Sequence, residues 1–375
     1  MDCVATCRPG LEGVLAAEIE KLGGRSIKPG KRSVAFSTNH PGLYRMNMAL
    51  RAAIQVLVPI RTFNARDYKL LYFQSRRTNW HQYFTADKTL RIDVNGHSPT
   101  LQNTQYVVHR VKDGIVDTFR KMTGGIRPSI DKAEPEIHVV VHMHGSKITL
   151  CLDSSGIPLF KRGYRLEHGE APIKEDLAAG ILQLSNAKEH AGIVDPMCGS
   201  GTFLFEGMML MHDMAPNLKR SFAFQHWLDY DEEAFLAEQA SLEKAGSIKK
   251  DIPIVGCDID EESIDLVKRI AATHFPDIPL TLHHSAFQEV ELDLPNCLMV
   301  TNPPYGKRLG EESELPALYR DIGTAAKKAV MGGRLAVFTT NRKAARQIRL
   351  TQDRSCTLFN GALEGLLYEY SVRGA

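Results

Sequence analysis

The pattern of apolar and polar positions in the first 155 residues is that of short strands and helices in alternation. Apolar residues recur at helical spacing in three main stretches, which predicts helices over residues 11–22, 41–53 and 105–122. Apolar runs between them predict strands at 3–8, 32–37, 54–60, 90–94, 137–141 and 148–152. This order indicates a small ferredoxin-like unit over residues 1–60, followed by a second α+β unit over residues 61–155.

The pattern changes after a linker rich in Gly and Pro, which leads into a helix beginning after Pro172. Apolar runs then predict strands at 191–194, 254–258, 280–284, 297–301, 334–338, 356–359 and 366–372. The last two are joined through Asn360-Gly361, a dipeptide typical of a hairpin turn. We therefore expect an α/β domain with a Rossmann-like, seven-stranded sheet over residues 156–375. The long segment 214–251 interrupts this series and either shapes a substrate entrance or decorates the surface.

Charge divides the chain at nearly the same place. The 375 residues carry a formal net charge of +2, but residues 1–165 contribute +12 and residues 166–375 contribute −10. An acidic catalytic half would repel a polyanion, so the division suggests a nucleic-acid docking module attached to an enzyme. A solvated basic face on an ordinary domain would give the same composition.

The second α+β unit carries cations and aromatic rings of the kind that bind RNA. The cations are Arg76, Arg77, Arg110, Lys112, Arg120, Lys121 and Arg127. Tyr72, Tyr83 and Tyr106 could stack on bases, although aromatic residues in α+β domains more often belong to the core.

Nothing in the sequence indicates a metal site, a disulfide framework or a membrane span. The seven cysteines are scattered and lack C-x-x-C spacing, so we expect reduced thiols. His142 and His144 share one face of a predicted strand, but no third ligand accompanies them. The chain starts without a basic and apolar leader and has no apolar stretch long enough to cross a bilayer, so we expect a cytoplasmic protein without a metal.

One tetrapeptide follows a predicted buried strand and offers groups for chemistry on an amine. The apolar run 297–301 ends at Asn302-Pro303-Pro304-Tyr305, and open α/β sheets bind ligands at the carboxyl ends of their strands. The side-chain oxygen of Asn302 and the carbonyl oxygen of Pro303 can each accept an N–H of an exocyclic amino group, while Tyr305 stacks on the ring. These acceptors localise the nitrogen lone pair and so prepare the amine to attack an electrophile. Asn-Pro and Pro-Pro are also ordinary turn signals, so the tetrapeptide alone leaves a plain loop open.

A glycine-rich turn lies upstream, also at the end of an apolar run. Residues 191–194 lead into the turn, which reads Asp195-Pro196-Met197-Cys198-Gly199-Ser200-Gly201-Thr202. Gly199 and Gly201 let a ligand approach the backbone closely, which is typical of a nucleotide-type site. The turn is not a P-loop, because no Gly-Lys-Ser/Thr follows, and the G-x-G-x-x-G spacing of dinucleotide-binding folds also fails.

A second predicted strand ends at Asp258, whose carboxylate is suited to accepting both hydroxyls of a ribose, although a lone Asp there is commonly a turn or cap residue. The glycine turn, this acidic strand end and Asn302-Pro303-Pro304-Tyr305 occur in the order found in class I S-adenosylmethionine-dependent methyltransferases. The three motifs together resemble the members of that family that methylate exocyclic or amide nitrogens.

The linker makes the resemblance more specific. Lys161-Arg162-Gly163-Tyr164-Arg165, followed by Ala171-Pro172-Ile173-Lys174-Glu175 and by the glycine turn, resembles the bacterial 23S rRNA guanine-N2 methyltransferases, including the N-terminal half of their two-enzyme fusion form. The resemblance covers essentially the whole chain, which ends without the second methyltransferase of that fusion. Residues 1–155 are similar to the ferredoxin-like plus THUMP arrangement of several RNA-modifying enzymes, with the THUMP domain at 61–155.

The resemblance implies S-adenosylmethionine as cofactor, RNA as partner and methyl transfer to the exocyclic N2 of a guanine in 23S rRNA. The implied cofactor-binding residues are Asp195, Met197, Cys198, Gly199, Ser200, Gly201, Asp258, Ile259, Ser285, Ala286, Phe287 and Asn302. The implied catalytic residues are Asn302, Pro303, Pro304 and Tyr305. Many relatives place an Asp beside the adenine where this chain has Ser285, so that contact departs from the family's pattern.

Three other functions stay open at this point. A DNA adenine-N6 methyltransferase would share the catalytic tetrapeptide, but the basic half has no recognisable major-groove reader. A tRNA guanine-N2 methyltransferase with the same layout differs only in the linker and the glycine turn. An RNA-binding or assembly factor with a silent methyltransferase fold is disfavoured by the intact Asn302, Tyr305 and Asp258.

Overall fold

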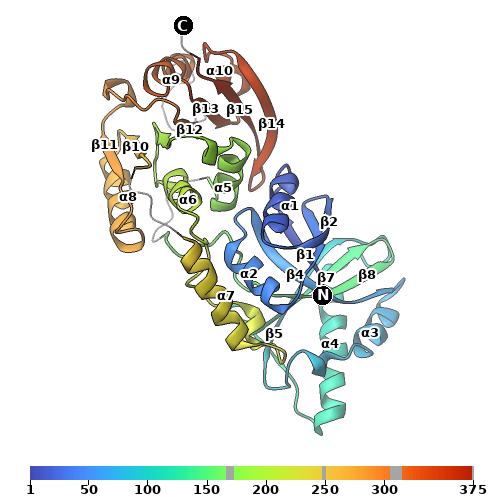
Figure 1. Ribbon diagram of the computed structural model, residues 1–375. Coiled ribbons are helices and arrows are strands. Elements are labelled where there is room, and N and C mark those ends of the chain that lie inside the picture. Colours follow the sequence, from blue (N-terminus) through green and yellow to red (C-terminus); the bar gives the residue numbers. More distant parts are fainter. Residues whose placement is uncertain (166–172, 247–250, 305–314, 374–375) are drawn as a thin grey trace.

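The computed structural model describes residues 1–165, 173–246, 251–304 and 315–373 (Figure 1). Two β-sheets lie at opposite ends of the molecule in this view, one built by the N-terminal half and one by the C-terminal half. Tyr305 and the linker residues 166–172 lie outside the described residues.

The N-terminal half forms one continuous eight-stranded sheet with the order β2-β3-β1-β4-β8-β7-β5-β6. Its strands are β1 (Asp2–Cys7), β2 (Arg25–Gly30), β3 (Ser33–Ser37), β4 (Ala53–Asn64), β5 (Thr89–His97), β6 (Ser129–Ile130), β7 (Ile137–His144) and β8 (Lys147–Asp153). The sequence pattern predicts all of these except β2 and the two-residue β6. Nearly all of β2 is exposed at the edge of the sheet, so it carries no alternation of apolar residues that would reveal it.

Strand β4 belongs to both units of this half. Its first residues pair with β1 from Ala53 to Leu57, and the remainder pairs with β8 from Leu57 to Asn64. The strand therefore crosses the boundary that we place at residue 60, and it is longer than the predicted strand at 54–60. The ferredoxin-like unit and the unit that follows it share a single sheet.

The helices of this half are α1 (Glu12–Lys21), α2 (His40–Ala49), α3 (Tyr68–Arg76) and α4 (Thr104–Thr123), with a 3₁₀ turn at Trp80–Gln82. Helix α4 confirms the prediction at 105–122. The Asn103 side chain accepts the backbone N–H of Tyr106 at its start, and Gly124 ends it with a φ of +71°. Its buried stripe is formed by Val107, Val111, Ile115 and Phe119, whereas Val108, which the spacing places inward, is only half-buried.

The C-terminal half forms a seven-stranded sheet with the order β11-β10-β9-β12-β13-β15-β14. Its strands are β9 (Ile193–Asp195), β10 (Ile254–Asp258), β11 (Thr281–His284), β12 (Leu298–Thr301), β13 (Arg334–Thr339), β14 (Gln352–Asn360) and β15 (Leu363–Ser371). Strands β9 to β13 run parallel, and β15 pairs antiparallel with β13 and with β14 through the turn after Asn360. The predicted seven strands and the predicted hairpin are confirmed.

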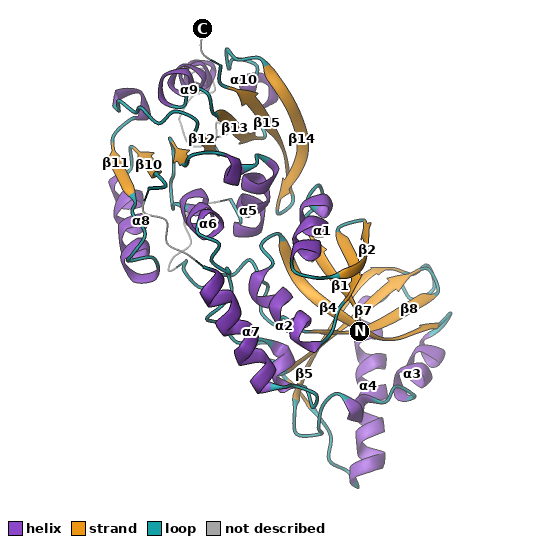
Figure 2. Cartoon of the chain, viewed as in Figure 1, coloured by secondary structure: helices purple, strands orange, loops and turns teal. Residues whose placement is uncertain are grey.

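The helices of the C-terminal half are α5 (Glu175–Leu184), α6 (Thr202–Met211), α7 (Glu232–Ala245), α8 (Glu261–His274), α9 (Leu315–Ala329) and α10 (Arg342–Ala345). Short 3₁₀ turns occupy Ala187–Glu189, Ala223–His226 and Phe287–Glu289. Figure 2 shows α1, α5 and α6 in the region between the two sheets, with α2 and α7 side by side next to the N-terminal sheet. The apolar core is continuous there, because one cluster of buried residues extends from β1 and α1 to α5, α6 and β9.

The described part of the segment 214–251 packs on α2 of the N-terminal half. The rings of Tyr44 and Phe224 stack with centroids 4.6 Å apart, and the backbone N–H of Asp231 donates to the Tyr44 hydroxyl at 3.0 Å. Arg45 makes two hydrogen bonds to Glu238, at 2.7 and 2.8 Å. This segment therefore joins the two halves and is not a surface decoration. Among the described residues, none of the helices combines the length and apolar character needed to cross a membrane.

Candidate active site

Three adjacent strands bring the predicted site residues to one edge of the C-terminal sheet. Strand β9 lies between β10 and β12, so the order of winding reverses on either side of it. The carboxyl ends of β9 and β10 are Asp195 and Asp258, and Asn302 follows directly after β12. Open α/β sheets bind ligands in the crevice at such a reversal point.

The glycine turn begins at the end of β9 and is fastened to β10. The backbone N–H of Cys198 donates to the carbonyl of Cys257 at 2.9 Å. Gly199 and Gly201 have φ angles of +48° and +76°, which favour glycine at both positions. A Cβ on Gly201 would come within 2.9 Å of Phe205 and of Val267, whereas nothing lies within 4 Å of a Cβ built on Gly199. The backbone at Gly199 is therefore accessible to a ligand.

Asp258, which is predicted to bind ribose hydroxyls, also stabilises the glycine turn. One carboxylate oxygen accepts the backbone N–H of Gly199 at 2.7 Å, and the other accepts that of Asp260 at 3.0 Å. Each carboxylate oxygen can accept a further hydrogen bond, so the side chain can hold the turn and still bind hydroxyl groups. The neighbouring Ile259 side chain is 66% exposed, an unusual amount for an isoleucine at this edge.

Burial changes the acid strength of the groups beneath the turn. Asp195 is 2% exposed, and burial, with the added charge of Asp258, raises its pKa to about 8, although the backbone N–H of Met197 at 3.2 Å acts in the opposite direction. Burial therefore favours the neutral form of the Asp195 carboxyl group. Burial and the neighbouring Asp195 raise the pKa of Cys198 well above its ordinary value, so this thiol is not an activated nucleophile.

The third predicted strand end lies beside Asp258. The backbone N–H of Ser285 donates to the carbonyl of Asp258 at 3.0 Å, and the Ser285 hydroxyl donates to Glu289 at 2.9 Å. Phe287 is buried in the apolar cluster that also contains Val255. Ser285 and Ala286 thus follow the end of β11 next to Asp258, while Phe287 packs in the apolar cluster.

The predicted catalytic tetrapeptide is described as far as Pro304. Strand β12 is buried over its whole length and delivers Asn302, half-buried, to the edge of the sheet. Pro303 is buried and Pro304 half-buried. The stacking role of Tyr305 remains a prediction, because this residue lies outside the described part of the chain.

The linker supplies a contact to the glycine turn that the site motifs do not predict. Arg165 donates from Nη2 to the hydroxyl of Thr202 at 2.8 Å, and its Nε lies 3.3 Å from a carboxylate oxygen of Glu175. Thr202 is the first residue of α6 and follows the turn directly. The signal in the sequence is the cation-rich run 161–165 ahead of an apolar helix, but it does not reveal which residue each cation contacts.

A second polar surface lies on α3 and α4 of the N-terminal half. A groove of about 510 Å³ is lined by Tyr72, Arg110, Lys112, Asp113, Val116, Asp117, Arg120 and Arg127. The Arg110 guanidinium lies 4.5 Å from the centre of the Tyr72 ring, and the Tyr72 hydroxyl donates to Asp117 at 2.7 Å. One face of Tyr72 is thus covered by Arg110, whereas Tyr106 is 45% exposed. In the described ranges no three His, Cys, Asp or Glu side chains are grouped closely enough to hold a metal ion.

Comparison with known protein families matches three models to successive parts of the chain. An RlmL ferredoxin-like domain matches residues 2–57, and a THUMP domain matches residues 65–153. The model described as RMKL-like, methyltransferase domain matches residues 162–369. These matches confirm the expected ferredoxin-like and THUMP arrangement and the methyltransferase fold that follows it.

Individual relatives agree with these models. A Marinomonas sp. (strain MWYL1) protein named ribosomal RNA large subunit methyltransferase K/L is 35% identical over 98% of this chain and 52% of its own length. The chain therefore spans about half the length of the K/L relatives that it matches. The Synechocystis sp. protein slr0064, a candidate RNA methyltransferase, is 33% identical over 98% of this chain and 96% of its own. The structure of SMU.472, a candidate methyltransferase complexed with SAH, superposes with a TM-score of 0.88 at 26% identity, covering 100% of this chain and 98% of that one.

Proposed function

Since the chain belongs to the RMKL-like methyltransferase family, we propose that it transfers a methyl group from S-adenosylmethionine to the exocyclic N2 amine of a guanine in 23S rRNA. The observation that carries this proposal is the grouping of the glycine turn, Asp258 and Asn302 at the reversal point of one parallel sheet. That grouping supplies a cofactor cradle and an amine acceptor on adjacent strands. We place the enzyme in the cytoplasm, where this RNA would be met.

The residues of the crevice fit S-adenosylmethionine from its methionine end to its adenine end. The glycine turn, with its open backbone at Gly199, would hold the methionine part through Asp195, Met197, Cys198, Gly199, Ser200 and Gly201. Asp258 would accept the ribose hydroxyls with the lone pairs that its two backbone contacts leave. The exposed Ile259 would cover one face of the adenine, while Ser285, Ala286 and Phe287 would border its edge. The bound cofactor supplies a methyl group activated by the adjacent sulfonium.

Asn302 and Pro303 would prepare the guanine amine. The Asn302 side-chain oxygen and the Pro303 carbonyl would each accept one N–H, so that the nitrogen lone pair points toward the methyl group. As the nitrogen forms its bond to the methyl carbon, the bond from that carbon to sulfur would break, which leaves S-adenosylhomocysteine. The nitrogen would then be cationic and would lose its proton afterwards, so no base is required before the attack. Tyr305, following Pro304, would stack on the guanine.

The guanine must leave its helix or loop to reach this crevice. Extrusion costs a few kcal/mol, less in a loop, and stacking on an aromatic ring returns about 1–3 kcal/mol. The cations of this groove, Arg110, Lys112 and Arg120 on α4 and Arg127 after it, would hold the surrounding RNA by its phosphates. The THUMP unit would therefore dock the RNA, and the seven-stranded sheet would carry out the chemistry.

The decisive test is tritiated methyl transfer from S-adenosylmethionine to RNA from a strain that lacks this protein. Purified 23S rRNA, tRNA and, for comparison, DNA are incubated separately with the labelled cofactor, and the labelled nucleosides are identified by chromatography. We expect N2-methylguanosine in 23S rRNA. Label in tRNA, in DNA or in an adenine would overturn the substrate assignment, and binding of the cofactor without any transfer would indicate a silent RNA-binding protein.

A further inference from the structure

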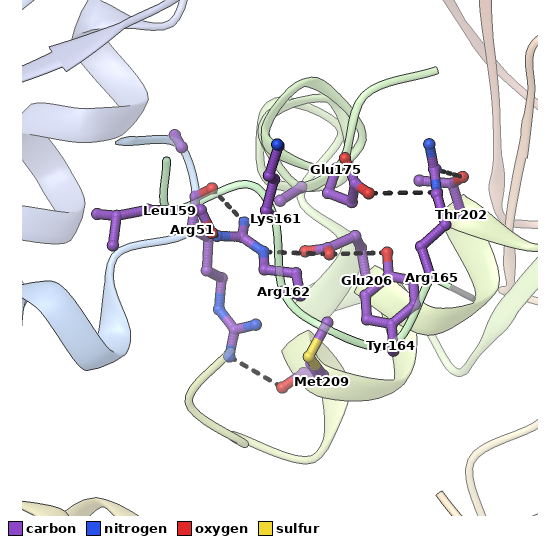
Figure 3. A network of polar contacts seen from close by, with 12 residues as sticks. Arg51, Leu159, Lys161, Arg162, Tyr164, Arg165, Glu175, Thr202, Glu206 and Met209 are labelled. Carbon is purple, nitrogen blue, oxygen red and sulfur yellow. Dashed lines mark hydrogen bonds and ion pairs between the residues drawn. The ribbon is translucent and has the colours of Figure 1, made fainter. Parts of the chain in front are cut away.

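Helix α6 follows the glycine turn directly and is held along its length by residues from outside the methyltransferase sheet (Figure 3). These residues come from the ferredoxin-like unit and from the linker run 161–165. The linker run supported the family resemblance, but the proposed reaction gives it no role.

The C-terminal end of α6 is held by Arg51, which belongs to the N-terminal half. This side chain is buried and donates from Nη2 to the carbonyls of Met209 at 2.9 Å and Met214 at 2.6 Å. Carbonyls at the end of a helix lack partners within the helix, and a cation there is stabilised by the helix dipole. Arg51 therefore caps α6 from a different domain.

The middle of α6 is held by the linker through Glu206, which is fully buried. One Glu206 oxygen accepts hydrogen bonds from Arg162 Nε at 3.3 Å and from the Tyr164 hydroxyl at 3.1 Å. Arg162 also donates from Nη2 to the carbonyl of Arg51 at 2.5 Å. The same guanidinium thus joins α6 to the ferredoxin-like unit, as Figure 3 shows.

The N-terminal end of α6 is held by Arg165 through the hydroxyl of Thr202, at 2.8 Å. A cation at the start of a helix is opposed by the helix dipole, so this placement gives α6 no electrostatic support of its own. Glu175, with an oxygen 3.3 Å from Arg165 Nε, offsets that charge. What the arginine does supply is a fixed position for Thr202, the residue adjacent to Gly201 of the turn.

We infer that Arg165 is a positioning residue for the cofactor, acting through Thr202 on a helix that Arg51 and Arg162 fix to the N-terminal half. The glycine turn is then held from two sides, by Cys257 and Asp258 of β10 and by the linker. The N-terminal half consequently contributes to cofactor binding as well as to RNA docking. This inference rests on the proposed function, because it takes the turn to be the cofactor cradle.

A double-mutant cycle on the full chain tests the contact directly. S-adenosylmethionine binding is measured by calorimetry, without RNA, for Arg165→Met, Thr202→Val and the double variant, with melting temperatures recorded alongside. We expect each single change to weaken binding about tenfold, and the double change to weaken it no further, since both remove the same charge-assisted hydrogen bond. Thr202→Ser keeps the hydroxyl and is expected to bind as the wild type does. Arg342→Met, which removes an exposed ion pair with Glu364, is the matched control.

The possible outcomes separate this inference from the proposed function. If the wild-type chain binds the cofactor and the variants bind it equally well, or if the effects of the two single changes add fully, the positioning role is overturned while the proposed function stands. A lowered melting temperature with unchanged affinity has the same meaning, since it shows a contact that serves stability alone. A wild-type chain that does not bind the cofactor overturns both.

Discussion

The two sheets of this protein differ in where they place their polar groups. In the C-terminal sheet the strands run parallel on both sides of a reversal point, and Asp195, Asp258 and Asn302 gather at the strand ends, buried or half-buried. In the N-terminal sheet most neighbours run antiparallel, and the RNA-binding candidates lie on helices α3 and α4 beside the sheet. Parallel strands whose order reverses create a binding site at their carboxyl ends. The largely antiparallel N-terminal sheet instead leaves its candidate binding groups on the surface of the neighbouring helices.

The charged groups of the two halves consequently differ in their exposure to solvent, and so in how strongly water and salt screen them. Beneath the glycine turn, burial raises the pKa of Asp195 and of Cys198, so the neutral form of both groups is favoured. On α4 the charges are accessible to solvent, and Arg110 and Arg120 already have the carboxylates of Asp113 and Asp117 nearby. Exposed charges of this kind act at long range and are weakened by salt.

The largest effect that separates the roles of the two halves is expected from Asn302→Ala. Removing one proposed acceptor for the guanine amine should lower methyl transfer by about 10²–10³-fold or more, while the affinity for S-adenosylmethionine stays nearly unchanged. Single-turnover methyl transfer and calorimetry measure the two quantities. Asn64→Ala, an exposed change in the N-terminal half, is the matched control. Substantial turnover by Asn302→Ala would show that the amine is prepared elsewhere.

Asp258→Ala is expected to weaken cofactor binding by about 10–100-fold, because it removes the proposed ribose acceptor together with the acceptor of the Gly199 N–H. Asp258→Asn retains one carbonyl acceptor and should bind more tightly than Asp258→Ala. Calorimetric titration with S-adenosylmethionine measures both, with the exposed Asp265→Ala as control. An affinity equal to that of the wild type would refute the ribose assignment.

The basic groove is expected to affect RNA binding in a salt-dependent manner. Replacing Arg110, Lys112, Arg120 and Arg127 with Gln should reduce the slope of log affinity against log salt by about 0.7–0.9 for each RNA phosphate that the variant no longer neutralises. Cofactor affinity should not change. Removing residues 1–155 would not be a clean test, because the two halves share a core. Gln at Lys268, Arg269, Lys327 and Lys328 of the C-terminal half is the control, and an equal change of slope there would contradict the division of roles between the halves.

A different kind of effect, on stability and not on activity, is expected from the buried Asp195 as pH changes. The pKa of Asp195 is raised from 3.8 to about 8, so the folded chain keeps a proton that the unfolded chain releases. Its contribution to the free energy of unfolding is therefore full below about pH 4, falls as pH rises toward about 8, and is constant above. Asp195→Asn cannot ionise, so urea unfolding should show its stability relative to the wild type rising over this window. A pH-independent difference would contradict the raised pKa.

Features of this fold that have local signals are the ones that the sequence predicts. The helix 104–123 has a regular apolar stripe and a capping Asn103, and the Asn360-Gly361 turn has the residues that a hairpin requires. The strand ends at Asp195, Asp258 and Asn302 follow from apolar runs and from a resemblance carried by motifs. The sequence therefore predicts which strands carry the site, and the order of these strands in the sheet follows from the resemblance.

Features that depend on contacts between distant residues have no such signal. Arg165 and Thr202 are 37 positions apart, and Tyr44 and Asp231 are 187 apart, so no periodicity connects them. The exposed strand β2 lacks apolar alternation, and the segment 214–251 gives no sign that it packs on α2. The burial that raises the pKa of Asp195 is likewise a property of the assembled sheet.

Strand β4, which both N-terminal units share, determines how the N-terminal half unfolds. Because its residues complete the hydrogen bonds of β1 at one end and of β8 at the other, melting either unit leaves the other with an unpaired sheet edge. The two units should therefore unfold in one cooperative step, and those amide protons of β4 that are hydrogen-bonded to β1 or to β8 should exchange at similar, slow rates at both ends of the strand. The domain boundary near residue 60 is therefore not a boundary between two independently stable units. Dividing the chain there would leave each fragment with an incomplete sheet.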